Sequence, residues 1–126
     1  MGVFINIHSE IEAIEHFEEY GLEIVRGRNK SILNKNYDRY YLDLGSFSLS
    51  LGISIKQLLE SISYIPVVGE YLAYYRKEQQ KPIQVLEITG LNELIRGLKG
   101  IGYNLDLLKT IRDQCNKLHE QIKERK

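Results

Sequence analysis

The fold is indicated most clearly by residues 91–122, LNELIRGLKGIGYNLDLLKTIRDQCNKLHEQI. Apolar residues recur here three or four positions apart, which is the spacing of one face of an α-helix. They are Leu91, Leu94, Leu98, Ile101, Leu105, Leu108, Ile111, Cys115, Leu118 and Ile122. This pattern predicts amphipathic helices whose apolar faces pack against the rest of the chain.

Three glycines divide the pattern into two helices. They lie at positions 97, 100 and 102, and each glycine disfavours a helix interior by about 1 kcal/mol. We therefore predict one helix near 91–99 and a longer one over 104–124, with Asn104 as the N-cap of the second. The last five apolar residues form a narrow stripe on this C-terminal helix.

A stripe of this kind packs either on the protein's own sheet or on a second copy of the chain. Packing on the sheet is our prediction, and a homodimer through the C-terminal helix is the alternative. Cys115 lies on the stripe and is expected to be a small buried side chain. Because the chain has one cysteine, it cannot form an internal disulfide, and we expect a cytoplasmic location.

Earlier in the chain, apolar residues alternate with polar ones as they do in β-strands. The clearest alternation comprises Phe47, Leu49, Leu51, Ile53 and Ile55. With the tyrosine-rich run before it, this predicts a hairpin of residues 38–44 and 46–54. Further strands are predicted at 22–26 and 83–89.

Helical spacing returns after residue 55. The pattern ends near Pro66, which is itself placed to begin another helix because proline suits a first helical turn. That helix would bury Tyr71, Leu72 and Tyr75.

The N-terminal segment predicts a short strand at 3–7 followed by a helix near 9–20. Ser9 and Glu12 have the spacing of a capping box, and a glycine at position 21 could end the helix. Glu12, Glu15 and Glu19 would then share one helix face. The whole chain, 1–126, is predicted to be a single α+β domain with a mostly antiparallel sheet, helices packed on one face and a long C-terminal helix.

Charge is balanced in total but divided along the chain. There are 17 Lys and Arg and 17 Asp and Glu, which argues against a general nucleic-acid binder because such proteins neutralise phosphates. Residues 1–25 contain six glutamates and no Lys or Arg, whereas residues 26–39 carry a net charge of +4. Either these blocks neutralise each other at the surface, or they face a partner. No uncharged run is long enough to span a bilayer, so no membrane association is expected.

Two short patterns carry possible chemistry. Gly100-Ile101-Gly102 resembles the turn of helix-hairpin-helix modules, which implies backbone amides facing a DNA phosphate. Arg112 and His119 resemble the Arg and His pair of HEPN ribonucleases, which implies a ribonuclease site at a dimer seam. The alternatives are a glycine-rich helix break used for packing and a chance spacing. No metal-ligand spacing, cofactor motif or catalytic set is found, so we lean against an enzyme and expect no metal or cofactor.

Tyrosine is abundant, with nine residues and no tryptophan. Tyr37, Arg39 and Tyr41 alternate on one predicted strand face. Tyrosine and arginine are concentrated at protein interfaces, although tyrosine also lines half-buried cores.

These observations predict a small non-catalytic interaction protein that binds and inhibits or regulates a protein partner, like an immunity, anti-defence or regulatory protein. Its binding residues would be Glu12, Glu15, Glu19, Tyr37, Arg39 and Tyr41. The alternative is a nucleic-acid-binding protein or small ribonuclease. That function would use Arg26, Arg28, Lys30, Lys35, Gly100 and Gly102, or Arg112 with His119.

Overall fold

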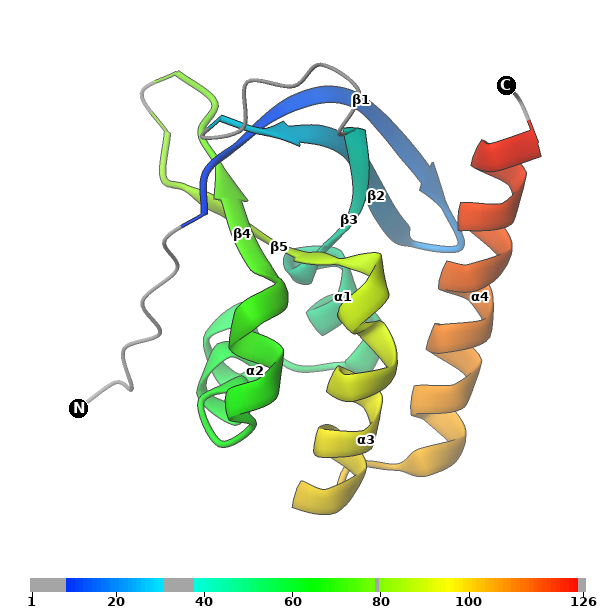
Figure 1. Cartoon of the computed structure of the whole chain (residues 1–126). Coiled ribbons are helices and arrows are strands. Elements are labelled where there is room, and N and C mark those ends of the chain that lie inside the picture. Colours follow the sequence, from blue (N-terminus) through cyan, green and yellow to red (C-terminus); the bar gives the residue numbers. More distant parts are fainter. Residues whose placement is uncertain (1–8, 31–37, 79, 125–126) are drawn as a thin grey trace.

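A computed structural model of the chain describes residues 9–30, 38–78 and 80–124 (Figure 1). A five-stranded sheet has the order β1-β2-β3-β5-β4, with each neighbouring pair antiparallel. The elements in chain order are β1 (Ile11–Glu19), β2 (Leu22–Asn29), β3 (Asp38–Asp43), α1 (Leu44–Leu51), α2 (Ile55–Ile62), the 3₁₀ helix η1 (Pro66–Tyr71), β4 (Leu72–Tyr75), β5 (Ile83–Glu87), the 3₁₀ turn η2 (Ile88–Gly90), α3 (Leu91–Ile101) and α4 (Leu105–Glu124). The predicted α+β class is confirmed, including the antiparallel sheet and the long C-terminal helix.

One face of the sheet packs against the helices. Ile24, Leu42, Leu86 and Leu72 are neighbours across four strands and are all buried in the main core. The apolar stripe of α4 reaches the same core, since none of its five side chains is more than 3% exposed. The helix stripe therefore packs on the protein's own fold, and its burial contributes about 1.5–3 kcal/mol for each large side chain.

The sheet curls until its two outer strands meet at one end (Figure 1). The amide of Tyr74 donates to the carbonyl of Ser9 at 2.9 Å, beside a parallel bridge between Glu10 and Tyr74. β1 approaches β2 closely at Gly27, where a Cβ atom would lie 2.8 Å from Cδ1 of Ile11. Glycine permits this approach because it has no side chain.

The concave face of the curled sheet holds a second, smaller core. It consists of Ile11, Val25, Tyr41, Ala73, Tyr75 and Val85. These residues alternate along their strands with those that face the helices, as the two-residue period of a strand requires. Both faces of the sheet are thus apolar near its centre, and polar groups gather at its rims.

The C-terminal predictions agree with the structure in detail. Helices α3 and α4 are separated by Gly102, whose φ of 113° ends α3 in the left-handed conformation. Asn104 caps α4, because its Oδ1 accepts from the amide of Leu107 at 3.1 Å. The helix predicted between residue 55 and Pro66 is present as α2, and the strands within 22–26, 38–44 and 83–89 are also present.

The predicted helix near 9–20 is wrong, because residues 11–19 form strand β1. Its partner is β2, joined by a two-residue turn in which Tyr20 and Gly21 have φ of 59° and 75°. Positive φ at both positions is what a tight hairpin turn requires. Ser9 and Glu12 therefore form no capping box, and Glu12, Glu15 and Glu19 do not share a helix face. The predicted strand at 3–7 lies outside the described residues.

The predicted strand at 46–54 is also wrong, because residues 44–51 form helix α1. Asp43 caps it by accepting from the amide of Ser46 at 3.0 Å, and Gly52 ends it with φ of 77°. Local capping at both ends outweighs the strand-like alternation of the sequence. The helix predicted after Pro66 is instead the 3₁₀ helix η1 followed by strand β4.

Candidate functional site

Four titratable side chains converge at one rim of the concave face. Nδ1 of His16 on β1 donates a 2.8 Å hydrogen bond to Oε1 of the Glu23 carboxylate on β2. The ring of His16 meets that of Tyr75 edge to face, with centroids 5.8 Å apart. Asp43, at the end of β3, is close enough for its charge to act on Tyr75. The four groups come from four different strands, so only the folded sheet brings them together.

The electrostatics of this rim are those of a partly desolvated acidic site. Burial raises the pKa of Asp43, the amide of Ser46 offsets part of that rise, and the charge of Glu23 adds to it. Burial, followed by the charges of Glu23 and Asp43, raises the pKa of Tyr75 to about 12. Tyr75 therefore keeps its proton at neutral pH and can only act there as a neutral hydroxyl. Among the described residues, no group of three or more His, Cys, Asp or Glu side chains could hold a metal ion.

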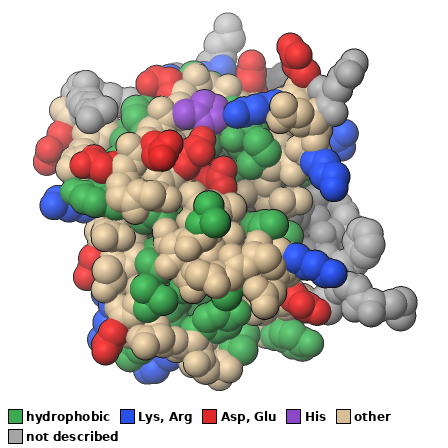
Figure 2. All heavy atoms as spheres, turned by 180° about the vertical axis from the view of Figure 1, so that it is seen from behind, with side chains coloured by type: hydrophobic (Ala, Val, Ile, Leu, Met, Phe, Trp, Pro, Cys, Tyr) green, Lys and Arg blue, Asp and Glu red, His purple; other side chains and the backbone are tan. Residues whose placement is uncertain are grey.

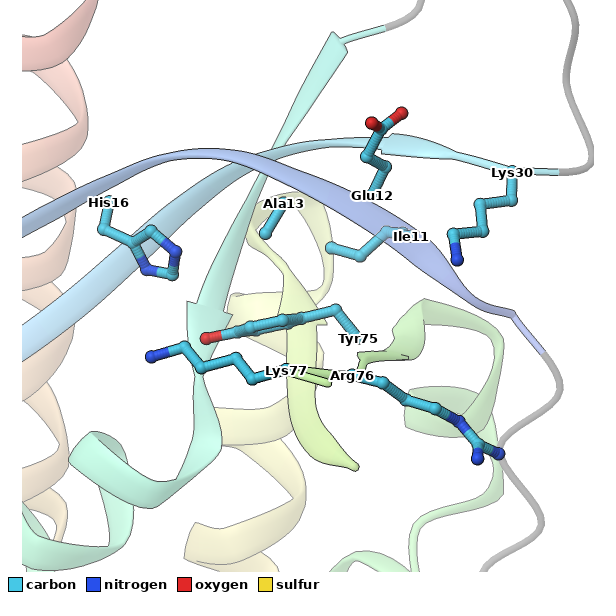
Figure 3. A pocket seen from close by; sticks show the side chains of 8 residues that line it. All are labelled: Ile11, Glu12, Ala13, His16, Lys30, Tyr75, Arg76 and Lys77. Carbon is cyan, nitrogen blue, oxygen red and sulfur yellow. The ribbon is translucent and has the colours of Figure 1, made fainter. Parts of the chain in front are cut away.

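A pocket of about 260 Å³ adjoins this rim, in the space between β1 and the chain that leaves β4. Figure 3 shows Ile11 and Ala13 pointing from β1 toward the ring of Tyr75, whereas Glu12 points away from it. Lys77 lies at the same end as the tyrosine hydroxyl and His16, and Lys30 and Arg76 lie toward the opposite end. The pocket is thus lined by both apolar and charged side chains, and Glu12 and His16 are among them.

The residues predicted to bind a partner are dispersed. Glu12 and Glu19 are exposed on β1. Glu15 instead accepts a 3.1 Å hydrogen bond from Nε of Arg26. Arg39 donates to Glu87 at 2.7 Å, and Tyr41 is only 4% exposed within the smaller core. Tyr37 lies outside the described residues. The five of these side chains that the structure describes do not gather on one surface.

The predicted basic segment is largely neutralised by neighbouring carboxylates. Arg26 is held by Glu15 and Asp38, and Arg28 donates from Nε to the other oxygen of Asp38 at 2.9 Å. Lys30 binds Glu10 at 2.8 Å, and Lys35 lies outside the described residues. Because β1 is acidic and pairs with basic β2, the two charge blocks of the sequence meet across the sheet. This arrangement supports mutual neutralisation of the two blocks.

The turn Gly100-Ile101-Gly102 forms the C-terminal end and cap of helix α3. Gly100 lies within α3, and the amide of Gly102 donates to the carbonyls of Leu98 and Lys99. That amide is therefore already used within the fold.

Arg112 and His119 do not converge. Seven positions along α4 separate them by about 10 Å along the helix axis. Arg112 contacts Asp113, while the ring of His119 packs against Tyr40 with centroids 5.0 Å apart. Burial, with the nearby charge of Lys123, lowers the pKa of His119.

An uncharged surface that the sequence reasoning missed lies on α1. Leu49 is 78% exposed, although the same helix is fixed by Phe47, which is fully buried. Figure 2 shows the side of the molecule that carries α1, with hydrophobic side chains over its middle and lower parts and a group of acidic side chains above them. Two further apolar side chains nearby in sequence are exposed, Tyr64 at 70% and Val67 at 46%. The sequence feature that could have indicated this surface is the absence of charged residues from positions 44–55.

Comparison with known protein families, with curated proteins and with solved structures gave no significant match. Within the described residues, no helix is long and apolar enough to cross a membrane.

Proposed function

We propose that this chain is a small non-catalytic interaction protein, which binds a protein partner through the exposed side of α1 and thereby inhibits or regulates it. The observation that carries the proposal is Leu49, a large apolar side chain that is 78% exposed on a helix anchored at both ends. Binding surfaces concentrate energy in a few large side chains at the centre, surrounded by polar ones. We call the exposed Leu49, together with the partly exposed Ser46 and Ser50, the α1 face.

The border of the α1 face suggests the chemistry of the partner. Ser46 lies one helical turn before Leu49, so both project from the same side of α1. The Oγ of Ser46 accepts from the amide of Glu23 at 3.0 Å, and Asp43 caps the same helix. Asp43 therefore places a carboxylate at the start of α1, and Figure 2 shows acidic side chains above the hydrophobic ones on this side of the molecule. A partner with an apolar recess and a basic rim would match this surface, because complementary charge favours encounter and orientation.

Rigidity supports the same proposal. The fold holds the α1 face in place through the cap at Asp43, the left-handed Gly52 and the buried side chains of Leu44 and Phe47. A preorganised surface loses little conformational freedom on binding. The single cysteine is buried and unpaired, in keeping with the cytoplasmic location we propose for this activity.

The second candidate, nucleic-acid binding or ribonuclease activity, receives less support. The basic side chains of β2 bind neighbouring carboxylates, and Arg112 and His119 lie apart on α4. A homodimer through α4 would need the polar side of that helix, since its apolar stripe is buried.

The proposal is tested by co-purification of the tagged chain from its native host. Leu49→Asp should remove the partner, with affinity reduced on the order of 10- to 100-fold, because a carboxylate replaces about 1.5–3 kcal/mol of apolar burial. Ile101→Asp is the matched control, because Ile101 is also exposed, at 45%, but lies on α3. Retention of every co-purifying protein by Leu49→Asp would contradict the proposal.

Light scattering of both variants distinguishes a second copy of the chain from a different protein. If the wild-type chain is a dimer that Leu49→Asp dissociates, the α1 face serves self-association and the proposed regulatory role is wrong.

A further inference from the structure

Strand β1 is an outer strand of the sheet, and most of its outer edge has no strand beside it. It pairs with β2 along its length, and on its other side it meets β4 where Glu10 bridges Tyr74. Beyond that bridge β1 diverges from β4 (Figure 1), and no other strand in the described part of the chain continues the sheet there. At nine residues, β1 is long for an edge strand.

The hairpin with β2 determines which backbone groups of β1 face outward. Its two-residue turn makes Glu19 and Leu22 the hydrogen-bonded pair that closes the hairpin. Bonded and non-bonded positions alternate along an antiparallel strand. Phe17 therefore also bonds toward β2, whereas the N–H and C=O groups of His16 and Glu18 point away from it.

The start of the strand shows the same alternation. The amide of Lys30 on the β2 side donates to the carbonyl of Glu10 at 3.0 Å, while the carbonyl of the preceding Ser9 accepts from Tyr74 on the β4 side. A bulge shifts this alternation once, at residues 13–15. The outward groups after the bulge are thus equivalent to the carbonyl of Ser9, which already bonds to a neighbouring strand.

The edge after the bulge is accessible. The side chains from Ile14 to Glu19 are exposed, apart from Phe17, which is partly buried. The pocket of about 260 Å³ opens beside this edge, between β1 and the chain that leaves β4. At the tip of the hairpin, Lys117 of α4 lies 5.4 Å from the ring centroid of Tyr20. The accessible stretch therefore ends before Tyr20.

The charges along this stretch favour one kind of added strand. Glu18 and Glu19 are exposed, and neither makes an ion pair with another residue that the structure describes. Glu18 lies opposite Glu23 in the hairpin, which adds a third carboxylate. Like charges placed opposite each other destabilise a strand pair, so a second copy of β1 is disfavoured. A strand that carries lysine or arginine is favoured instead.

We propose that the outer edge of β1, from Ala13 to Glu19, binds an extended basic segment of another protein, which adds a sixth strand to the five-stranded sheet. Backbone hydrogen bonds to His16 and Glu18 supply the affinity, and basic side chains beside the glutamates supply the selectivity. This edge contains no residue of the α1 face, so the inference does not depend on the function proposed above.

The test adds a nine-residue peptide of alternating lysine and valine, blocked at both ends, to the ¹⁵N-labelled chain. In the free chain the amide hydrogens of His16 and Glu18 should exchange rapidly with solvent, whereas that of Phe17 is protected by β2. The peptide, at up to about 1 mM because a short isolated segment binds weakly, should slow exchange at His16 and Glu18. It should also shift the amide signals of residues 13–19.

Two further peptides separate strand pairing from charge attraction. An analogue that is N-methylated at every residue keeps the positive charge but cannot donate backbone hydrogen bonds, so it should not bind. A peptide with glutamate in place of each lysine keeps the backbone donors and reverses the charge. It should bind at least about tenfold more weakly than the lysine peptide, because it places like charges beside the glutamates.

Variants of the chain make the same separation. Glu18→Gln should weaken the lysine peptide about two- to fivefold, the range for one exposed charge pair, while Glu70→Gln, at an exposed position on η1, should not change binding. Glu18→Pro also removes the outward amide, and should weaken binding about tenfold beyond Glu18→Gln. Proline is tolerated where the amide of an edge strand faces solvent, and a thermal melt checks that the variant folds.

The proposal is overturned if the lysine peptide leaves exchange at His16 and Glu18 unchanged, or if both amides are already protected in the free chain. It is equally overturned if the N-methylated analogue binds as tightly as its parent, or if folded Glu18→Pro binds as well as Glu18→Gln. Should Glu18→Pro not fold, the N-methylated analogue still decides. None of these outcomes bears on the α1 face, whose test uses different residues and a different readout.

Discussion

Two glycines on α3 should respond to alanine in opposite ways. In an ordinary helix, replacing glycine with alanine gains about 1 kcal/mol because alanine restricts the unfolded chain and favours helical geometry. At Gly100 a Cβ atom would have nothing within 4 Å. At Gly97 it would lie 2.5–2.7 Å from three carbons of Ile65.

The magnitudes follow from these two environments. Gly100→Ala should raise the free energy of unfolding by about 0.5–1 kcal/mol. Gly97→Ala has the same intrinsic gain, but it forces the branched side chain of Ile65, which is 8% exposed, to shift within a packed core, at a cost of about 1–3 kcal/mol. The two variants should therefore differ by about 1–3 kcal/mol, with Gly97→Ala the less stable.

Urea denaturation followed by circular dichroism measures both values, and thermal melts provide a check. For a chain of this length, a difference of 1 kcal/mol corresponds to about 3–5 °C in Tm. Equal stabilisation by both alanines would refute the packing of Ile65 against α3. Destabilisation by both would show that residue 100 is not helical.

Three other outcomes are expected. Arg26→Ala should lower the free energy of unfolding by about 1–2 kcal/mol, because the Arg26 side chain is only 17% exposed and bridges two carboxylates. This value lies between those for exposed and for fully buried ion pairs. A urea titration that detects no change would refute a stabilising role for these ion pairs. Asp43→Asn should stabilise the protein at pH 7, because asparagine still caps α1 whereas the raised pKa of Asp43 shows that its ionised form is costly in the folded state. The gain in stability should disappear as the pH falls toward 4 and Asp43 becomes protonated. A difference in Tm between the two proteins that stays constant over this pH range would contradict the prediction. The thiol of Cys115, whose pKa burial raises to about 12, should react with a thiol reagent at pH 8 only as fast as the protein unfolds, so rapid labelling in native buffer would show that it is accessible.

The two C-terminal helices, α3 and α4, were predictable because their signals agree with one another. The apolar spacing of α3 and α4, the left-handed glycine between them and the asparagine cap all indicate two helices. Each signal is local, so no knowledge of distant contacts is needed to interpret it.

The N-terminal half was mispredicted at two elements where local and long-range signals compete. In β1, Ile11, Ile14 and Phe17 have helical spacing, but eight residues of the strand pair with β2, and this pairing determines the structure. In α1, alternating Ser and Leu suggest a strand, whereas Asp43 and Gly52 cap a helix.

The candidate sites could not be predicted because they depend on strand order. His16, Glu23, Asp43 and Tyr75 are brought together only by four separate strands. The neutralisation of Arg26 similarly requires the register between β1, β2 and β3. Sequence reasoning identified the acidic and basic blocks correctly, but it could not determine that they would face each other.

The most direct measurement of the proposed role places a photo-crosslinking amino acid at Leu49 in the native host, with the same substitution at Ile101 for comparison. If the chain acts through the α1 face, Leu49 should yield one discrete adduct with another protein, and Ile101 should not. Absence of an adduct at Leu49, or the same set of adducts at both positions, would contradict the account.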